Sequence, residues 1–474
     1  MLSSAVNNET IAAIATAAGT AAIGIIRISG TDSIKIVSEI FRFKGKIATH
    51  RMYYGKIVFG GKVIDEVMVA VFLAPKTFTA EDTVEIYTHG GIFVTSAVLD
   101  AVIKSGARHA TPGEFTKRAY LNGRINLTQA EAVMDIIGAK SELARRVGLR
   151  QLGGSLSSRI TDLRGKILSW IAHIELSIDY PEHEEEAKNA QQILTEAPMV
   201  VQELGELLKT ASIGRIIKNG LKTAILGKPN VGKSTILNYI LSEDRAIVHA
   251  LPGTTRDVLT EEVRIGNLAL VLMDTAGIRK TSDEIEKIGM DKSFEAGQEA
   301  DIVLYVIDAT VGISYEDIEL IRIFGDKVVL LYNKVDLAPG GIRGFQVSDA
   351  IQAMDDKDLR SMQVANAIYN NLIRVSAKTG AGFAELFAKL ESMHLPQAMS
   401  NDENEIITRE RHRLLIESAM MSLQTALIEL ENGTTEDLVS INLREAYRKL
   451  GEILGEETGD DIAERIFAEF CVGK

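Results

Sequence analysis

The sequence predicts a multidomain protein: an N-terminal α+β domain, a helical domain, and a doubly wound α/β domain inserted into the helical domain. Up to about residue 120, short β-branched runs alternate with turn signals and helical stretches. From about 123 to 215, and again after 395, apolar residues recur at helical spacing. Between about 220 and 394, buried-strand runs alternate with helix-length segments, which is typical of a mainly parallel sheet.

The domain boundaries follow from these changes of pattern. We expect the α+β domain at 1–122, the two parts of the helical domain at 123–218 and 395–474, and the α/β domain at 219–394. Insertion is the economical arrangement because the two ends of a domain often lie close together. A length of 474 residues suits roughly three domains.

The N-terminal 30 residues are predicted to form two strands around the turn AAGTAA at 17–22. No basic residue precedes the Ala/Ile run, as a signal peptide requires, and Gly and Thr interrupt it too often for a membrane span. Further strands are expected in KIVFGGKVIDEVMVAVFLA (56–74) and DTVEIYTHGG (82–91), with a helix in TSAVLDAVIKSG (95–106).

The helices after residue 395 should present one apolar side to a core. Five residues with helical spacing predict that side of the first helix: Leu415, Ala419, Leu423, Leu427 and Leu430. Further helices are expected over 436–454 and 459–470. In the last of these, Ile462, Ile466, Phe467 and Phe470 share one side.

Net charge and cysteine content argue against two classes of protein: general nucleic-acid coating proteins and disulfide-stabilised proteins. A net charge of -13 argues against sequence-independent coating of nucleic acid, because the chain repels polyphosphate at long range. Two arginine-rich helical stretches, at 143–150 and 408–415, are either local basic sites or solvated helix faces. One cysteine excludes an internal disulfide framework, so we expect a cytoplasmic protein.

GKPNVGKST at 227–235 follows a predicted strand and opens a helical pattern, the context of a phosphate-binding loop. Backbone N–H groups and the helix N-terminus can surround phosphates. Lys233 is expected to neutralise the β- and γ-phosphates, and Ser234 to offer a hydroxyl to Mg²⁺. The other nucleotide-binding candidates in this loop are Asn230, Val231, Gly232 and Thr235.

Four further motifs follow in the order found in Ras-like GTP-binding domains. Thr255 in PGTTRD can bind Mg²⁺, and Asp274 in DTAG can reach it through water. Asp336 in NKVD can accept two N–H bonds from the guanine edge, which adenine does not offer. SAK at 376–378 can place an N–H near the guanine carbonyl. The remaining candidates in these motifs are Thr275, Ala276, Gly277, Asn333, Lys334, Ser376, Ala377 and Lys378.

The group that positions the attacking water is missing from its usual place. In Ras-type switches a glutamine follows the Asp-x-x-Gly element, whereas this chain has Ile278, which has no hydrogen-bonding side chain. The sequence therefore predicts a GTPase that uses another polar group.

Motifs along the whole chain resemble the MnmE (TrmE) family of tRNA modification GTPases. Besides the nucleotide motifs, the matching segments include GIIRISG, FTAEDTVEIYTHGG, TPGEFTKRAYLNGRINLTQAEAVMDII, DTAGIRKTSDEIEKIGM and the terminal FCVGK. The resemblance implies a tetrahydrofolate-binding domain that dimerises, a helical domain and an inserted GTPase domain. It also implies a FAD-containing partner, MnmG (GidA), and modification of the wobble uridine of tRNA with a carboxymethylaminomethyl or aminomethyl group.

The same resemblance assigns the hydrolytic residues. Glu286 matches the family's catalytic glutamate, with a surface-helix glutamate as the alternative. Asn230 matches its K⁺ ligand, with a loop-stabilising asparagine as the alternative. Further K⁺ contacts correspond to His249, Leu251 and Thr254, where the family usually has Thr-Asp in place of His249-Ala250. This switch segment adds the nucleotide-binding candidates His249, Ala250, Leu251, Pro252, Gly253 and Thr254.

The folate site implied by the resemblance collects distant residues. Arg27, Glu85, Arg124 and Lys474 match folate-contacting positions, and the ligand is a methylene- or formyl-tetrahydrofolate. A carboxylate suits the donor-rich pterin edge, and cations suit a carboxylate tail. Arg124 stands where lysine is common, and AAGTAA stands where the family usually has Pro-Gly-Arg-Gly.

Two other functions compete with this interpretation. A ribosome-assembly GTPase would have a similar nucleotide domain, but it would need an RNA-binding module after it, where this chain is predicted to be helical. A lipid-anchored GTPase would use Cys471 in the terminal CVGK, yet the preceding DDIAERIFAEF is acidic rather than polybasic. We therefore expect the tail to carry Lys474 to the folate site, with Cys471 either a catalytic thiol or a buried apolar residue.

Overall fold

The computed structural model describes residues 9–179, 186–242, 261–273, 294–338, 370–395, 405–456 and 460–473. The chain divides into two compact units. The first comprises Met1–Ile137, Gly148–Gly205 and Leu414–Lys474; the second comprises Gly138–Val147 and Glu206–Arg413. Each unit is therefore built from segments that are far apart in the sequence.

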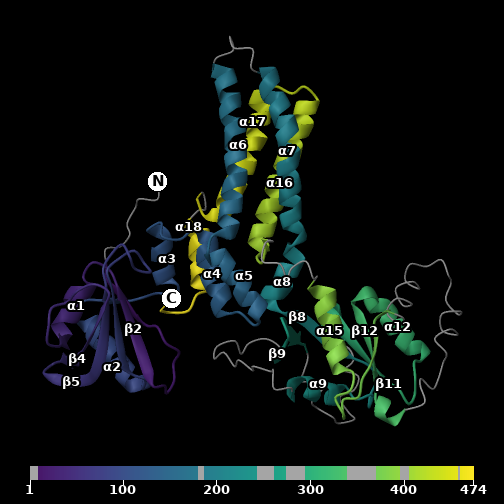
Figure 1. The fold of residues 1–474 in the computed structure, drawn as a ribbon, viewed down its shortest axis with the longest axis horizontal. Helices are drawn as coiled ribbons and strands as arrows, with labels where there is room; N and C mark the ends of the chain where they lie inside the picture. Colours follow the sequence, from purple (N-terminus) through teal and green to yellow (C-terminus); the bar gives the residue numbers. More distant parts are fainter. Residues whose placement is uncertain are drawn as a thin grey trace. The chain divides into compact units, whose positions relative to one another are not determined.

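A seven-stranded sheet forms the N-terminal part of the first unit (Figure 1). Its spatial order is β3-β4-β5-β6-β2-β1-β7, and every neighbouring pair is antiparallel except β1 with β7. The strands are β1 (Ile11–Ile14), β2 (Ile23–Ser29), β3 (Phe41–Arg42), β4 (Arg51–Phe59), β5 (Lys62–Phe72), β6 (Thr83–His89) and β7 (Arg108–His109). The predicted strand pair around AAGTAA is confirmed by β1 and β2.

Two helices cover one face of this sheet. They are α1 (Ser33–Ile40) and α2 (Ile92–Lys104), and both contribute to one apolar core with the strands. Alternation along β2 places Ile26 and Ile28 in that core and Arg27 on the opposite face. Arg27 therefore lies on the face that these helices do not cover.

The rest of the first unit is helical, and it includes segments from both ends of the chain. Helices α6 (Ser155–Asp179) and α17 (Glu436–Leu454) run side by side (Figure 1). Arg164 joins them, because its Nε donates to Tyr447 O at 3.2 Å and its guanidinium lies 4.1 Å from the Tyr447 ring. The first unit also contains α3 (Glu114–Leu121), α4 (Leu127–Ile137) and α18 (Asp460–Ala468). The boundary between the units falls within α5 (Glu142–Leu152), α7 (Glu186–Lys209) and α16 (Glu410–Glu431), and α8 (Ala211–Asn219) belongs to the second unit.

The second unit contains a six-stranded sheet of order β13-β12-β11-β8-β10-β9. Its neighbouring pairs are parallel except β9 with β10. The strands are β8 (Leu221–Leu226), β9 (Glu261–Ile265), β10 (Leu268–Leu272), β11 (Ile302–Asp308), β12 (Val328–Asn333) and β13 (Leu372–Arg374). Its helices include α9 (Lys233–Ser242), α12 (Tyr315–Phe324) and α15 (Phe383–His394). The predicted doubly wound α/β fold is confirmed.

Two details of the predicted helical packing are wrong. On α16, Ala419, Leu423 and Leu430 are buried as predicted, but Leu415 and Leu427 are only partly buried, and Ile416 and Ala426 are buried instead. On α18, Ile462 is exposed although Phe467 is buried. Among the helices of the described segments, none has the length and apolar character that a bilayer span requires.

Candidate functional site

The predicted phosphate-binding loop connects β8 to α9, as the sequence pattern indicated. Gly227 and Gly232 have positive φ angles of +142° and +102°. A Cβ at Gly227 would collide with Val306 O, and one at Gly232 with Asn333 Nδ2. Glycine is therefore required at both positions for close approach as well as for backbone conformation.

The loop is fastened to the motif at the end of β12. Asn333 is buried, and its Nδ2 donates to Val231 O at 2.9 Å while its Oδ1 accepts from Ala377 N at 3.1 Å. Lys334 Nζ donates to Asn230 O at 2.8 Å and contacts Asp308 Oδ2 at 2.6 Å. The three predicted segments at the carboxyl ends of β8, β12 and β13 are therefore brought together.

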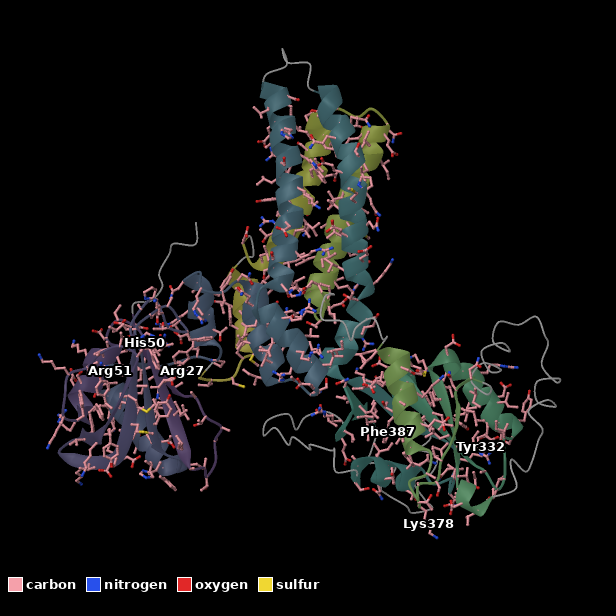
Figure 2. The ribbon with its side chains drawn as sticks, viewed as in Figure 1. Arg27, His50, Arg51, Tyr332, Lys378 and Phe387 are labelled. Atoms are coloured by element: carbon pink, nitrogen blue, oxygen red, sulfur yellow. The ribbon has the colours of Figure 1, made fainter. Side chains whose placement is uncertain are left out.

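The predicted guanine-recognition residues also meet. Ser376 Oγ donates to Asp336 Oδ1 at 2.7 Å, which orients the carboxylate expected to accept the guanine N–H groups. Ser376 N donates to Ala381 O at 2.9 Å, so the loop after β13 is closed on itself. Lys378 is exposed at the periphery of this domain (Figure 2).

Lys233, at the first position of α9, folds back onto its own loop. Its Nζ donates to the carbonyls of Gly227 and Lys228, each at 2.7 Å. Phosphate oxygens would compete for the same ammonium group, because they are stronger, charged acceptors. Ser234 and Thr235 follow in the first turn of α9, where N–H groups have no partner within the helix.

Several predicted residues lie outside the described residues, and their placement stays a prediction. They are Glu286, His249, Ala250, Leu251, Pro252, Gly253, Thr254, Thr255, Asp274, Thr275, Ala276, Gly277 and Lys474. Within the described part of the chain, no cluster of three or more His, Cys, Asp or Glu residues is arranged to hold a metal ion. The expected Mg²⁺ and K⁺ ligands are hydroxyl, amide and carbonyl oxygens, together with phosphate, and do not depend on such a cluster.

A second candidate site lies on the N-terminal sheet, on the face opposite α1 and α2. Arg27 Nε donates to Glu85 Oε1 at 2.9 Å across the paired strands β2 and β6. Tyr87 Oη donates to Glu85 Oε2 at 2.8 Å. Burial and this bond to Glu85 raise the pKa of Tyr87 to about 12, so the phenol stays protonated and keeps its hydrogen for Glu85.

Phe78 connects two of the predicted folate residues. The guanidinium carbon of Arg124 lies 5.2 Å from the centre of the Phe78 ring, and that of Arg27 lies 6.0 Å from it. Both distances are within the range of cation–π attraction. Arg27 and Arg124 therefore share one ring, and Glu85 joins them through its ion pair with Arg27.

The carboxyl-terminal tail reaches this site. Arg27 Nη1 donates to Gly473 O at 3.3 Å, and Gly113 N donates to Cys471 O at 3.4 Å. Cys471 is exposed, so the alternative of a buried, purely apolar cysteine is wrong. The tail contacts Arg27 through its backbone, one residue before Lys474.

A pocket of about 330 Å³ adjoins the tail. Its lining includes Ala13, Thr16, His109 and Val472, together with part of the loop between β1 and β2. Val472 lines this pocket and the next residue, Gly473, contacts Arg27, so the tail takes part in both.

The sequence did not identify Phe78 and Tyr87 as site residues. Both lie in the segment FTAEDTVEIYTHGG, where the sequence signal is family resemblance rather than a chemical pattern. Tyr87 could have been found from strand alternation, because it is two residues from Glu85 and so shares its face. Phe78 lies in a loop, and no periodic pattern predicts its direction.

Comparisons with known proteins agree along nearly the whole chain. Residues 10–124 match the family model described as the GTP-binding protein TrmE N-terminus, and 127–471 match the MnmE helical domain. The tRNA modification GTPase MnmE of Thermoanaerobacter pseudethanolicus is 42% identical over 98% of this chain and 99% of its own. The tRNA modification GTPase MnmE of Desulforamulus reducens is 41% identical over 98% of this chain and 100% of its own. A solved Era structure from Aquifex aeolicus is 27% identical over 42% of this chain and 66% of its own, with a TM-score of 0.25, too low to compare folds.

Proposed function

This chain belongs to the family of the tRNA modification GTPase MnmE, and on that premise we propose that it hydrolyses GTP in the modification of tRNA. The observation that carries the proposal is the extent of the similarity. Relatives named as this GTPase match 98% of the chain, including the N-terminal and helical parts that a general GTP-binding domain lacks.

Selectivity for guanine is assigned to the loops after β12 and β13. Asp336 accepts two N–H bonds from the base, and Ser376 holds that carboxylate by its hydroxyl. Asn333 supports the base site indirectly, since it ties the loop after β13 to Val231 in the phosphate loop. Adenine offers an acceptor where guanine donates, so ATP binds poorly.

Hydrolysis is assigned to Lys233 and Glu286. Lys233 exchanges its bonds to the loop carbonyls for bonds to the β- and γ-phosphates, where it stabilises negative charge. Glu286 orients the attacking water, because Ile278 has no group that can do so. Mg²⁺, held by the hydroxyls of Ser234 and Thr255, supplies further positive charge to the phosphates.

A potassium ion is proposed beside the phosphate loop. Asn230 has a positive φ of 63°, a conformation that asparagine tolerates better than most residues, and Lys334 binds its backbone carbonyl. The Asn230 amide oxygen remains chemically suited to a monovalent cation. Contacts from His249, Leu251 and Thr254 complete the proposed ligand set.

The N-terminal sheet is proposed to bind a tetrahydrofolate that carries a one-carbon unit. Glu85 accepts from the pterin edge, while Arg27, Arg124 and Lys474 bind polar or anionic parts of the ligand. The contact of Gly473 with Arg27 supports this assignment for the tail. Exposure of the Cys471 thiol is compatible with a chemical role, and Cys471→Ser should then abolish modification while GTP hydrolysis persists.

The oligomeric state, the partner protein, the cellular location and the modified product are proposed from the family alone. We propose a homodimer that acts with the FAD-containing protein MnmG on the wobble uridine of tRNA, in the cytoplasm. The product carries a carboxymethylaminomethyl or aminomethyl group. The competing ribosome-assembly function is disfavoured, because the described residues after 405 are helical and match the MnmE helical domain.

Steady-state nucleotide hydrolysis by the purified full chain tests the enzymatic part. GTP with Mg²⁺ should be hydrolysed and ATP should not, and replacing K⁺ by Na⁺ at constant ionic strength should slow the reaction. Lys233→Ala is the negative control for contaminating phosphatases. Equal rates for the parent and this control would contradict the proposal.

A further inference from the structure

Lys228, the second residue of the phosphate loop, extends its side chain to the start of α12. Its Nζ donates to Ser314 Oγ at 2.6 Å and lies 2.7 Å from Glu316 Oε2 and 3.8 Å from Asp317 Oδ2. The bond to Glu316 raises the pKa of Lys228, so this residue is a cation at neutral pH. The phosphate loop is thereby tied to a helix that none of the nucleotide motifs includes.

Asp317 is the buried centre of this contact. Only 4% of the residue is exposed. Its Oδ1 accepts from Tyr305 Oη at 2.8 Å, and its Oδ2 accepts from Ser314 N at 2.8 Å and from Ser314 Oγ at 2.7 Å. The Ser314 hydroxyl donates its one hydrogen to Asp317, and its oxygen accepts the hydrogen bond from Lys228 Nζ.

Glu316 is nearer to Lys228 than Asp317 is, but it is a weaker anchor. The Glu316 side chain is 79% exposed, against 5% for Asp317. Water and salt screen an exposed ion pair, and such pairs contribute little to stability. A buried carboxylate needs a nearby cation, and Lys228 supplies it here.

We propose that Asp317 is a positioning residue for nucleotide binding: through Ser314 and Lys228 it holds the first residues of the phosphate loop in the shape that receives GTP. This inference rests on the proposed GTPase function. Tyr305, on β11, donates to the other oxygen of the same carboxylate. Asp317 is therefore held both by Ser314 at the start of α12 and by Tyr305 in the sheet.

The geometry explains how the effect reaches the phosphates. The carbonyl of Lys228 accepts a hydrogen bond from Lys233 Nζ, so the position of Lys228 affects where that ammonium group lies before nucleotide binds. Lys334 fastens the loop two residues later, at Asn230 O. Asn333 holds Val231 O, the next residue of the loop. If the contact of Lys228 is lost, nucleotide binding must also order the start of the loop, which weakens affinity.

Affinity for a fluorescent GDP analogue, measured with the purified full chain, tests the proposal. Lys228→Met and Asp317→Asn should each raise Kd about tenfold. The double variant should also stay near tenfold, because both changes remove the same contact, whereas independent effects would multiply to about 100-fold. Lys228→Arg, which keeps the charge, should restore most of the affinity. For Asp317→Asn, kcat at saturating GTP should match that of the parent chain while KM rises.

Two controls separate positioning from a loss of stability. Glu316→Gln should leave Kd unchanged, because the exposed carboxylate is the weaker partner. Leu390→Ala removes a fully buried side chain of α15 that is not part of this contact, so it should lower the unfolding temperature and leave Kd unchanged. Two results would overturn this inference and leave the proposed GTPase function standing. One is a Kd for Asp317→Asn within about twofold of the parent value; the other is effects of the two single variants that multiply in the double variant. A parent chain that binds no guanine nucleotide would overturn the proposed function as well.

Discussion

Replacing Gly473 by alanine should detach the carboxyl-terminal tail from Arg27 without unfolding the protein. Gly473 has a φ of +93°, where a residue with a side chain is strained by about 1–2 kcal/mol. An added Cβ would also collide with Ile14 O and would lie only 3.0 Å from Ala15 Cα. These are backbone atoms at the end of a strand, so the tail must move rather than its neighbour.

The size of the effect follows from the distances. Relief of the collision requires the tail to withdraw by roughly 0.5 Å or more, which lengthens the 3.3 Å bond from Arg27 Nη1 to Gly473 O beyond hydrogen-bonding range. A hydrogen bond to a charged group contributes about 1.5–3 kcal/mol. Since the site is partly exposed, we expect the lower end of that range, or about a tenfold loss of folate affinity.

Isothermal titration of 5-formyltetrahydrofolate into the parent chain and the Gly473→Ala variant measures this loss. Gly433→Ala is the matched control, because Gly433 also has a positive φ, of 75°, but open space around its Cβ position. The control should bind folate normally, and GTP hydrolysis should persist in both variants. Equal folate affinity of the parent and Gly473→Ala chains would refute the role given to the tail.

Three further predictions concern single side chains. Asp336→Asn should reduce GTP affinity by at least about 100-fold and improve xanthosine triphosphate binding, because the amide donates where the carboxylate accepted; competition binding measures both. Glu286→Ala should slow hydrolysis by at least about 100-fold while GTP still binds, and unchanged turnover would remove Glu286 from the mechanism. Burial would raise the pKa of Glu114, but bonds from Arg108, Thr111 and Arg118 outweigh it and lower the pKa to about 2. That carboxylate therefore stabilises the fold above about pH 4.5 and loses this contribution as the pH falls toward 2; Glu114→Gln should lower the unfolding temperature at pH 7 and make little difference near pH 2.

The sequence was most informative where a motif stands at the end of a buried strand. The segments around Asn230, Asn333 and Ser376 meet as predicted, because parallel strands bring their carboxyl ends to one edge of the sheet. The contact of the tail with Arg27 was expected from family resemblance alone. No periodicity relates residues 446 positions apart.

Other features depend on packing that sequence patterns do not encode. On α16, Leu423 is buried as predicted, but Leu415 and Leu427 are only partly buried, and Ile416 and Ala426 beside them are buried instead. A helical stripe of apolar residues does not by itself determine which of its edges faces the core. The Lys228–Ser314–Asp317 contact joins a loop and a helix 86 residues apart. Ser314 and Asp317 have capping-box spacing, and that local signal gives no indication of a third partner.

Wobble-uridine analysis of tRNA from cells that lack the gene tests the central claim most directly. Nucleosides from purified tRNA are compared between the parent strain, the deletion strain and the deletion strain carrying the gene. The carboxymethylaminomethyl and aminomethyl modifications should disappear on deletion and return with the gene. Normal modification in a deletion strain without a redundant enzyme would contradict it, and defects confined to ribosomal subunits would favour the ribosome-assembly function.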